Sequence, residues 1–149
     1  MRETFKASQV EALTGITGRE LGQHRRRVRL PARTSRKCTV AELTALAAWG
    51  EINRLHPLHG NRSIRCFEMA EEQAAALLDS PDAWLFIAVL DADHPADGDF
   101  LATNADLALA ADEYGGLRAM CIIPLGAALS SLRSKLTPEA ATPALRLAA

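Results

Sequence analysis

The sequence of 149 residues predicts an α+β protein, with a helical part first and a mixed part of short strands and helices after it. Three observations predict this arrangement. Residues 1–56 carry three helix-start signatures, in which a Ser or Thr is followed three positions later by Glu. Residues 62–136 alternate short apolar runs with segments of helical spacing. The charge also changes sign, because residues 1–56 hold eleven Lys or Arg and five Asp or Glu, whereas residues 57–149 hold six and thirteen.

The first two helix-start signatures lie close together and predict two short helices joined by a turn. The three signatures are Ser8 with Glu11, Thr17 with Glu20, and Thr39 with Glu42. We expect helices over residues 9–14, 18–27 and 39–54. Gly15 can adopt the positive φ that a tight turn needs, and Leu21 and His24 are expected to face inward from the second helix. A short helix, a tight turn and a basic second helix form a helix-turn-helix.

The segment after the second helix is predicted to form a wing. Pro31 excludes a helix across residues 28–38, and the composition there suits an irregular or short two-stranded structure. Residues 56–61 contain Pro, Gly and Asn, which are typical of a linker. We therefore expect a winged helix-turn-helix domain over residues 1–56 and a second domain over residues 62–136.

The second domain is predicted to have the ferredoxin-like order β-α-β-β-α-β, followed by one further helix. Its expected strands are Ile64–Phe67, Trp84–Leu90, Phe100–Thr103 and Leu117–Ile123. Its expected helices are residues 70–78, a helix from Thr103 to Tyr114, and a final helix marked by Leu125, Leu129, Leu132 and Leu136. Residues 137–149 are rich in Pro and Ala, which predicts a flexible tail.

Residues 5–55 also follow the motif order of a known family. Phe5 precedes the first helix, residues 9–17 read QVEALTGIT, and Arg19-Glu20-Leu21 lies in the second helix. Val28–Pro31 and Arg36–Leu43 complete the order. In this order and spacing, the segment resembles the winged helix-turn-helix of the MerR superfamily. The resemblance implies that the second helix enters the major groove of DNA and that the wing reaches toward the DNA backbone or minor groove.

Basic residues are the candidate DNA contacts. Between Arg19 and Lys37 the chain has eight Lys or Arg and a single carboxylate, a density typical of a protein that binds a polyanion. Helical spacing puts Arg19, Gln23 and Arg26 on one face, from which Arg could bond guanine and Gln could bond adenine. The expected phosphate contacts are Thr17, Arg25, Arg27, Arg29, Arg33, Arg36 and Lys37. The alternative for Arg25–Arg27 is a plain solvated helix end.

Together these features predict a sequence-specific transcriptional regulator that binds double-stranded DNA and belongs to a bacterium or phage. One short helix makes few contacts, so we expect a homodimer joined through the acidic second domain. A small effector or another protein is a further candidate partner of that domain. Two alternatives stay open. One is a phage-type accessory factor, such as an excisionase or a small packaging subunit, and the other is a protein-interaction or ligand-sensing module that does not bind DNA.

No enzyme, metal site or cofactor is predicted. His56 and His59 lie in a linker without nearby metal ligands, and the sequence offers no phosphate loop or nucleophile–base set. The longest apolar run, Trp84–Leu90, is too short to cross a bilayer. Three dispersed cysteines and an N-terminus without an apolar stretch predict a cytoplasmic protein.

Overall fold

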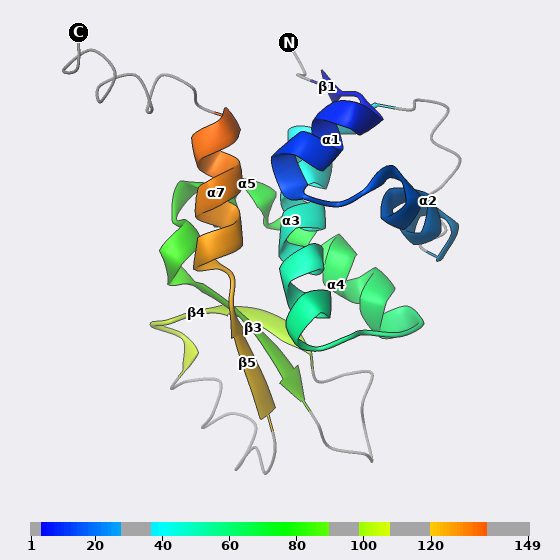
Figure 1. Ribbon diagram of the computed structural model, residues 1–149. Helices are drawn as coiled ribbons and strands as arrows, with labels where there is room; N and C mark the ends of the chain where they lie inside the picture. Colours follow the sequence, from blue (N-terminus) through cyan, green and yellow to red (C-terminus); the bar gives the residue numbers. More distant parts are fainter. Residues whose placement is uncertain (1–3, 28–36, 90–98, 108–119, 137–149) are drawn as a thin grey trace, which may run out of the picture.

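The computed structural model describes residues 4–27, 37–89, 99–107 and 120–136. Its helices are α1 (Ala7–Thr14), α2 (Gly18–Arg27), α3 (Val40–Leu55), α4 (Asn61–Glu72), α5 (Ala74–Asp79), α7 (Gly126–Leu136) and the short 3-10 helix η1 (Pro81–Ala83). Its strands are β1 (Thr4–Phe5), β2 (Cys38–Thr39), β3 (Trp84–Val89), β4 (Phe100–Thr103) and β5 (Met120–Pro124). The helices gather on one side of a three-stranded sheet (Figure 1), so the predicted α+β class is confirmed.

Helix α3 is the centre of the fold. Every residue from Glu42 to Ala48 is buried, and so is Ile52, so most of the helix is covered on all sides. Helices α1, α4, α5 and α7 all pack on it (Figure 1). The small side chains of Ala45, Ala47 and Ala48 let these neighbours approach closely.

Two of the three predicted helix starts are confirmed, one at α2 and one at α3. At α3, the Thr39 N–H donates to Glu42 Oε2 at 2.7 Å and the Glu42 N–H donates to Thr39 Oγ1 at 3.2 Å. The signature at Ser8 is wrong, because α1 begins at Ala7 with Lys6 as its N-cap. The Gln9 side chain accepts from the Lys6 N–H at 2.8 Å, so Ser8 lies inside the first turn.

One buried cluster spans both sides of the predicted domain boundary. It runs from Phe5 through Leu46 of α3 to Phe67, Phe86 and Leu132. The stretch around residues 56–62 therefore marks a change in charge, and the core is shared across it. The division into two domains stays a prediction from charge and composition.

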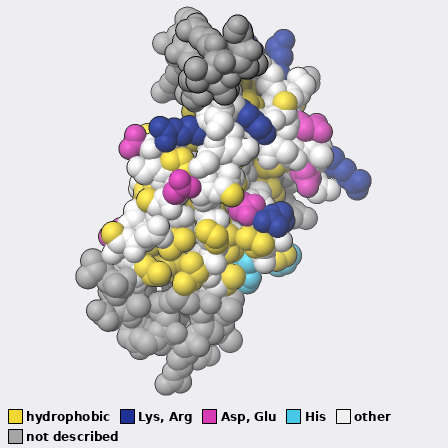
Figure 2. Space-filling view, turned by 60° about the vertical axis from the view of Figure 1, so that its left-hand side comes forward, with side chains coloured by type: hydrophobic (Ala, Val, Ile, Leu, Met, Phe, Trp, Pro, Cys, Tyr) yellow, Lys and Arg dark blue, Asp and Glu magenta, His cyan; other side chains and the backbone are white. Residues whose placement is uncertain are grey.

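The three-stranded sheet is antiparallel, with the order β4-β3-β5. Phe86 lies opposite Ile123, and both belong to the core cluster, so this face of the sheet packs against the helices. Ile87 lies opposite Ile122 on the other face, where Ile122 is 43% exposed. Hydrophobic side chains gather at the level of the sheet in Figure 2, whereas charged side chains are scattered over the helical part.

The predicted strand Ile64–Phe67 is wrong, because these residues lie within α4. The buried positions of α4 are Ser63, Cys66, Phe67 and Ala70, a spacing typical of one helix face. Ser63 and Cys66 complete that face, and Ser63 does not stand out as a core residue in the sequence because Ser is mostly exposed in proteins. The predicted ferredoxin-like order loses its first strand, and the larger sheet has three strands among the described residues.

The other predictions for the second part agree with the structure in most places. Strands β3 and β4 and helix α7 lie where they are expected, and Leu125, Leu129 and Leu132 are fully buried. Strand β5 includes Pro124 as its last residue, and the helix expected over residues 70–78 is divided at Gln73 between α4 and α5. Three further predictions lie wholly or mostly outside the described residues: the wing, the helix from Thr103 to Tyr114, and the tail after Leu136.

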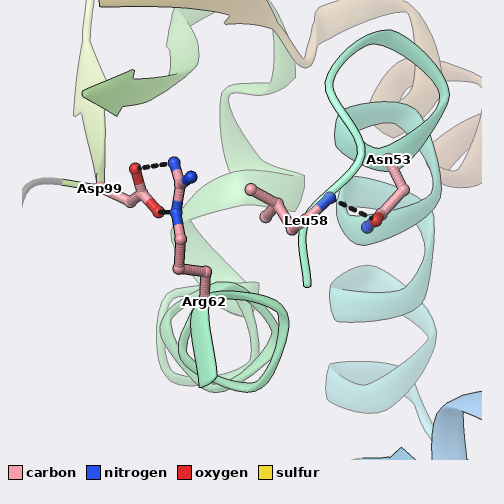
Figure 3. Close-up of polar contacts among 4 residues, drawn as sticks. All are labelled: Asn53, Leu58, Arg62 and Asp99. Carbon is pink, nitrogen blue, oxygen red and sulfur yellow. Dashed lines mark hydrogen bonds and ion pairs between the residues drawn. The ribbon is translucent and has the colours of Figure 1, made fainter. Parts of the chain in front are cut away.

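Arg62 and Asp99 form an ion pair that joins α4 to the residue before β4 (Figure 3). Arg62 Nε lies 2.7 Å from Asp99 Oδ2, and Arg62 Nη2 lies 2.7 Å from Asp99 Oδ1. The Asp99 side chain is only 5% exposed, against 24% for Arg62. The bond to Asp99 raises the pKa of Arg62 above its ordinary value. Because two short bonds join the nearly buried Asp99 to Arg62, the pair fixes α4 against the sheet.

Asn53 fixes the turn between α3 and α4 (Figure 3). Its Oδ1 accepts from the Leu58 N–H at 3.0 Å, and its Nδ2 donates to the Trp49 carbonyl at 2.9 Å. Trp49 Nε1 in turn donates to Ser63 Oγ of α4 at 2.8 Å. The segment predicted as a linker is thus held in a defined turn by side chains of α3.

Replacing Arg62 tests the ion pair. Arg62→Ala should lower the free energy of unfolding by about 2–3 kcal/mol, because it removes two charge-assisted hydrogen bonds from a nearly buried carboxylate. Arg54→Ala is the matched control, since Arg54 pairs with Glu51 at the surface and its loss should cost much less. Urea unfolding at pH 7 measures both. Equal losses would mean that water or another group satisfies Asp99.

Cys66 should make the stability depend on alkaline pH. Burial, together with the charge of Asp99, raises the pKa of the Cys66 thiol from 9.0 to about 12. The unfolded thiol ionises first, so its contribution is present below pH 9 and is lost as the pH rises toward 12. Between pH 8 and pH 10 the loss should be about 1.4 kcal/mol.

The Cys66→Ala variant isolates this contribution. Urea unfolding of the variant should show a drop in stability between pH 8 and pH 10 that is smaller than that of the wild type by the same amount. Identical pH dependence in both proteins would show that the folded thiol ionises as readily as the unfolded one.

Candidate nucleic-acid interface

Helix α2 carries the predicted DNA-contacting residues, and its start is fixed by a reciprocal pair of bonds. The Thr17 N–H donates to Glu20 Oε2 at 2.8 Å, and the Glu20 N–H donates to Thr17 Oγ1 at 3.2 Å. The Thr17 hydroxyl also donates to Glu20 Oε2 at 3.0 Å. These bonds satisfy the first backbone N–H groups of a helix only ten residues long.

The turn before α2 is tight and anchored. Gly15 has φ +74° and its N–H donates to the Glu11 carbonyl at 2.8 Å, which confirms the predicted left-handed turn. The next residue, Ile16, is 6% exposed and packs on α3 at Gly50, where an added β-carbon would lie 3.3 Å from Ile16 Cδ1. A residue larger than Gly at position 50 would therefore press on Ile16 and disturb the turn.

The orientation of α2 follows from one buried residue. Leu21 is 4% exposed and belongs to the core cluster, whereas Arg19, Gln23 and Arg26 are all exposed. The three exposed residues are four and three positions apart, which puts them on one side of the helix. In Figure 1, α2 stands at the edge of the molecule, across α1 and α3 from α7. Arg26 Nε donates to the Gly22 carbonyl of the same helix at 3.2 Å.

The predicted phosphate contacts are described only in part. Lys37 is exposed just before β2, while Arg29, Arg33 and Arg36 lie outside the described residues. The side chains of His24, Arg25 and Arg27 are likewise outside the description. Thr17 is exposed, but its N–H and hydroxyl already bond Glu20, so a phosphate there would have to replace that carboxylate.

A two-residue antiparallel ladder joins β1, which precedes α1, to β2, which precedes α3. Phe5 of β1 pairs with Cys38 of β2, and Thr4 pairs with Thr39. Phe5 and Cys38 are both buried in the core, at 7% and 2% exposure. The segment predicted as the wing thus lies between α2 and the ladder, and its residues 28–36 are outside the described residues.

Lys135 of α7 also contacts the end of α1. The sequence analysis does not predict this contact. Its Nζ donates to the carbonyls of Ala12 and Leu13, at 3.2 and 3.4 Å. Both carbonyls belong to the last turn of α1, where the helix dipole is negative and attracts a cation. Because more than a hundred residues separate Lys135 from α1, no local sequence pattern could have revealed this contact.

The described residues offer little for other chemistry. No group of three or more His, Cys, Asp or Glu among them is placed to hold a metal ion. Within the same residues, no helix combines the length and apolarity needed to cross a membrane. The candidate functional side chains of the described residues are the exposed Arg19, Gln23 and Arg26 of α2.

Comparison with known protein families, curated proteins and solved structures gives no match to this chain. Its chemistry can be argued from its own residues. Three features of the described residues bear on function: the exposed side of α2, the turn at Gly15, and the bond from Lys135 to α1.

The turn can be tested with two glycines that differ only in backbone conformation. A β-carbon added at Gly15 or at Gly22 would meet no atom within 4 Å, but Gly15 has φ +74° and Gly22 lies inside α2. Gly15→Ala should lower the free energy of unfolding by about 1 kcal/mol, because the left-handed region disfavours a β-carbon. Gly22→Ala should raise it by about 0.5–1 kcal/mol. Thermal and urea unfolding measure both, and a loss at Gly22 would show that α2 is not a regular helix.

Proposed function

We propose that this protein is a transcriptional regulator that binds double-stranded DNA sequence-specifically through α2. The observation that carries the proposal is the exposed row of Arg19, Gln23 and Arg26, on a helix oriented by the buried Leu21. The sequence resemblance to the MerR winged helix-turn-helix supports the same function. In this proposal α2 is the recognition helix and the segment after it is the wing.

The spacing of the exposed row suits a major groove. Arg19 and Arg26 are seven residues apart, which is about 10 Å along a helix. Base pairs are stacked about 3.4 Å apart, so the row can span about three of them. An Arg guanidinium forms two parallel bonds with guanine, and a Gln amide does so with adenine. Arg26 would exchange its bond to the Gly22 carbonyl for such a contact.

Charge supports a polyanion partner. Residues 1–56 carry a net charge of about +6, and residues 57–149 about −7, by counting Lys, Arg, Asp and Glu. The positive half would bring the protein to DNA through its phosphates, by release of counterions. The negative half would be repelled from the duplex, so α2 and the wing are the surface that faces DNA.

A homodimer is the form in which we propose that the protein acts. One α2 reads too few base pairs for useful specificity, whereas two copies read two half-sites about one helical turn apart. The net charge of about −7 on residues 57–149 keeps this part away from the duplex, which leaves it to make the contact between the two copies. The operator would then be an inverted repeat.

Selection of bound duplexes from a random pool tests the function. We expect an inverted repeat with half-sites of about three or more specified base pairs. Equal binding of every duplex would favour an accessory or architectural role instead. No binding at low salt would leave a module that senses a ligand or a protein.

Arg26→Ala should relax the preference at one base pair of each half-site, at a cost of about 1–3 kcal/mol in discrimination. Arg133→Ala is the charge-matched control, because Arg133 lies on α7 and bonds the Asp79 carbonyl. It should leave the selected sequence unchanged. Binding to the selected duplex and its single-base variants measures both, and the same loss of preference in the two variants would exclude base reading by Arg26.

A further inference from the structure

An open hollow of about 530 Å³ lies where the helix-turn-helix meets α3 and α7. It is lined by Ala47, Gly50 and Arg54 on α3, and by Ala128 and Ser131 on α7. These residues recur every three or four positions, so each helix turns one face to the hollow. Because four of the five are small, the two helices leave a space between them. Its volume is within the range of sites for small molecules.

The acidic groups at the hollow are already bonded to other groups of the protein, whereas the basic groups keep hydrogen-bond donors for a ligand. Glu51 pairs with Arg54, whose Nε and Nη2 lie 3.2 and 2.7 Å from the carboxylate, and Glu20 bonds Thr17. Both carboxylates are thus neutralised or bonded within the protein. Among the described residues, Arg54 keeps the N–H groups of Nη1, and Lys135 bonds only the neutral carbonyls at the end of α1. The hollow therefore favours an anion over a cation.

We propose that this hollow binds a small organic carboxylate, with its apolar part against Ala47, Gly50 and Ala128 and its carboxylate on Lys135. A carboxylate is a stronger acceptor for the ammonium group than the two peptide carbonyls that it bonds in the free protein. Binding therefore draws Lys135 away from Ala12 and Leu13.

This movement connects the hollow to α2. Ala12 and Leu13 form the last turn of α1, directly before the Gly15 turn that leads into α2. Loss of the Lys135 contact frees that end of α1 and changes the orientation of the recognition helix. The carboxylate then acts as an effector of DNA binding, and this regulatory role rests on the proposed function. By linkage, DNA must change the affinity for the carboxylate by the same factor.

Benzoate is the probe, and neutral benzamide of nearly the same shape is its control. Amide chemical shifts of the ¹⁵N-labelled full-length protein are followed during titration with each compound. We expect saturable shifts for benzoate at residues 13–16, Gly50, Ala128 and Ser131, with a dissociation constant of about 10 mM or lower. Benzamide should bind at least about tenfold more weakly. Shifts elsewhere on the protein, or equal binding of the two compounds, would overturn the proposal.

Two variants separate the site from the fold. Lys135→Met keeps most of the side chain but removes the charge, and it should weaken benzoate binding at least about tenfold. Ala128→Phe keeps Lys135 and fills the hollow, and it should abolish saturable binding. Lys6→Met, on the far end of α1, is the charge-matched control and should bind benzoate like the wild type. Wild-type affinity in Ala128→Phe would show that benzoate binds outside the hollow.

A measurement of DNA binding distinguishes the failure of this proposal from the failure of the proposed function. Affinity for the selected duplex is measured with and without saturating benzoate, in the wild type and in Lys135→Met. We expect benzoate to change the affinity of the wild type several-fold and to leave that of Lys135→Met unchanged. Benzoate binding without any DNA binding would refute the proposed function and keep the site. DNA binding that benzoate does not alter would refute the regulatory role.

Discussion

The burial of α3 is the constraint on which the rest of the structure depends. Seven consecutive residues of this helix are buried, so it must be surrounded, and its neighbours come from both ends of the chain. Helix α1 covers one side together with Ile16, α4 and α5 cover another, and α7 returns from the far end of the sequence to complete the layer. The acidic second half therefore supplies part of the support for the basic first half.

That support explains how a helix of ten residues with little core of its own can be presented to a partner. Helix α2 buries Leu21 and leaves its charged side outward, while the Gly15 turn and Ile16 hold its start against α3. An isolated helix of this length would be marginal in water. The helix is ordered by its packing on the rest of the protein. A group that alters the packing of α1 on α3 would also alter the position of α2.

Contacts between residues close in the sequence could be predicted from it, whereas contacts between distant segments could not. The pairs Thr17–Glu20 and Thr39–Glu42 could be predicted because a capping box involves residues three apart. The Ser8 signature is wrong because Gln9 takes the role of Glu11 two residues earlier in the chain. The strand expected at Ile64–Phe67 failed because the burial of Ser63 and Cys66, which reveals the helical period, depends on Asp99, Trp49 and α3. The bond from Lys135 to α1 joins distant segments and has no local pattern.

The short ladder between β1 and β2 has a mechanical consequence. Both ends of residues 6–37 are tied together at Phe5 and Cys38, so this segment is a closed loop attached to the body. Tension along this segment is therefore taken up by the ladder, at Cys38 and Thr39. Thr39 is the N-cap of α3, so the same tension acts on the first turn of the helix at the centre of the protein.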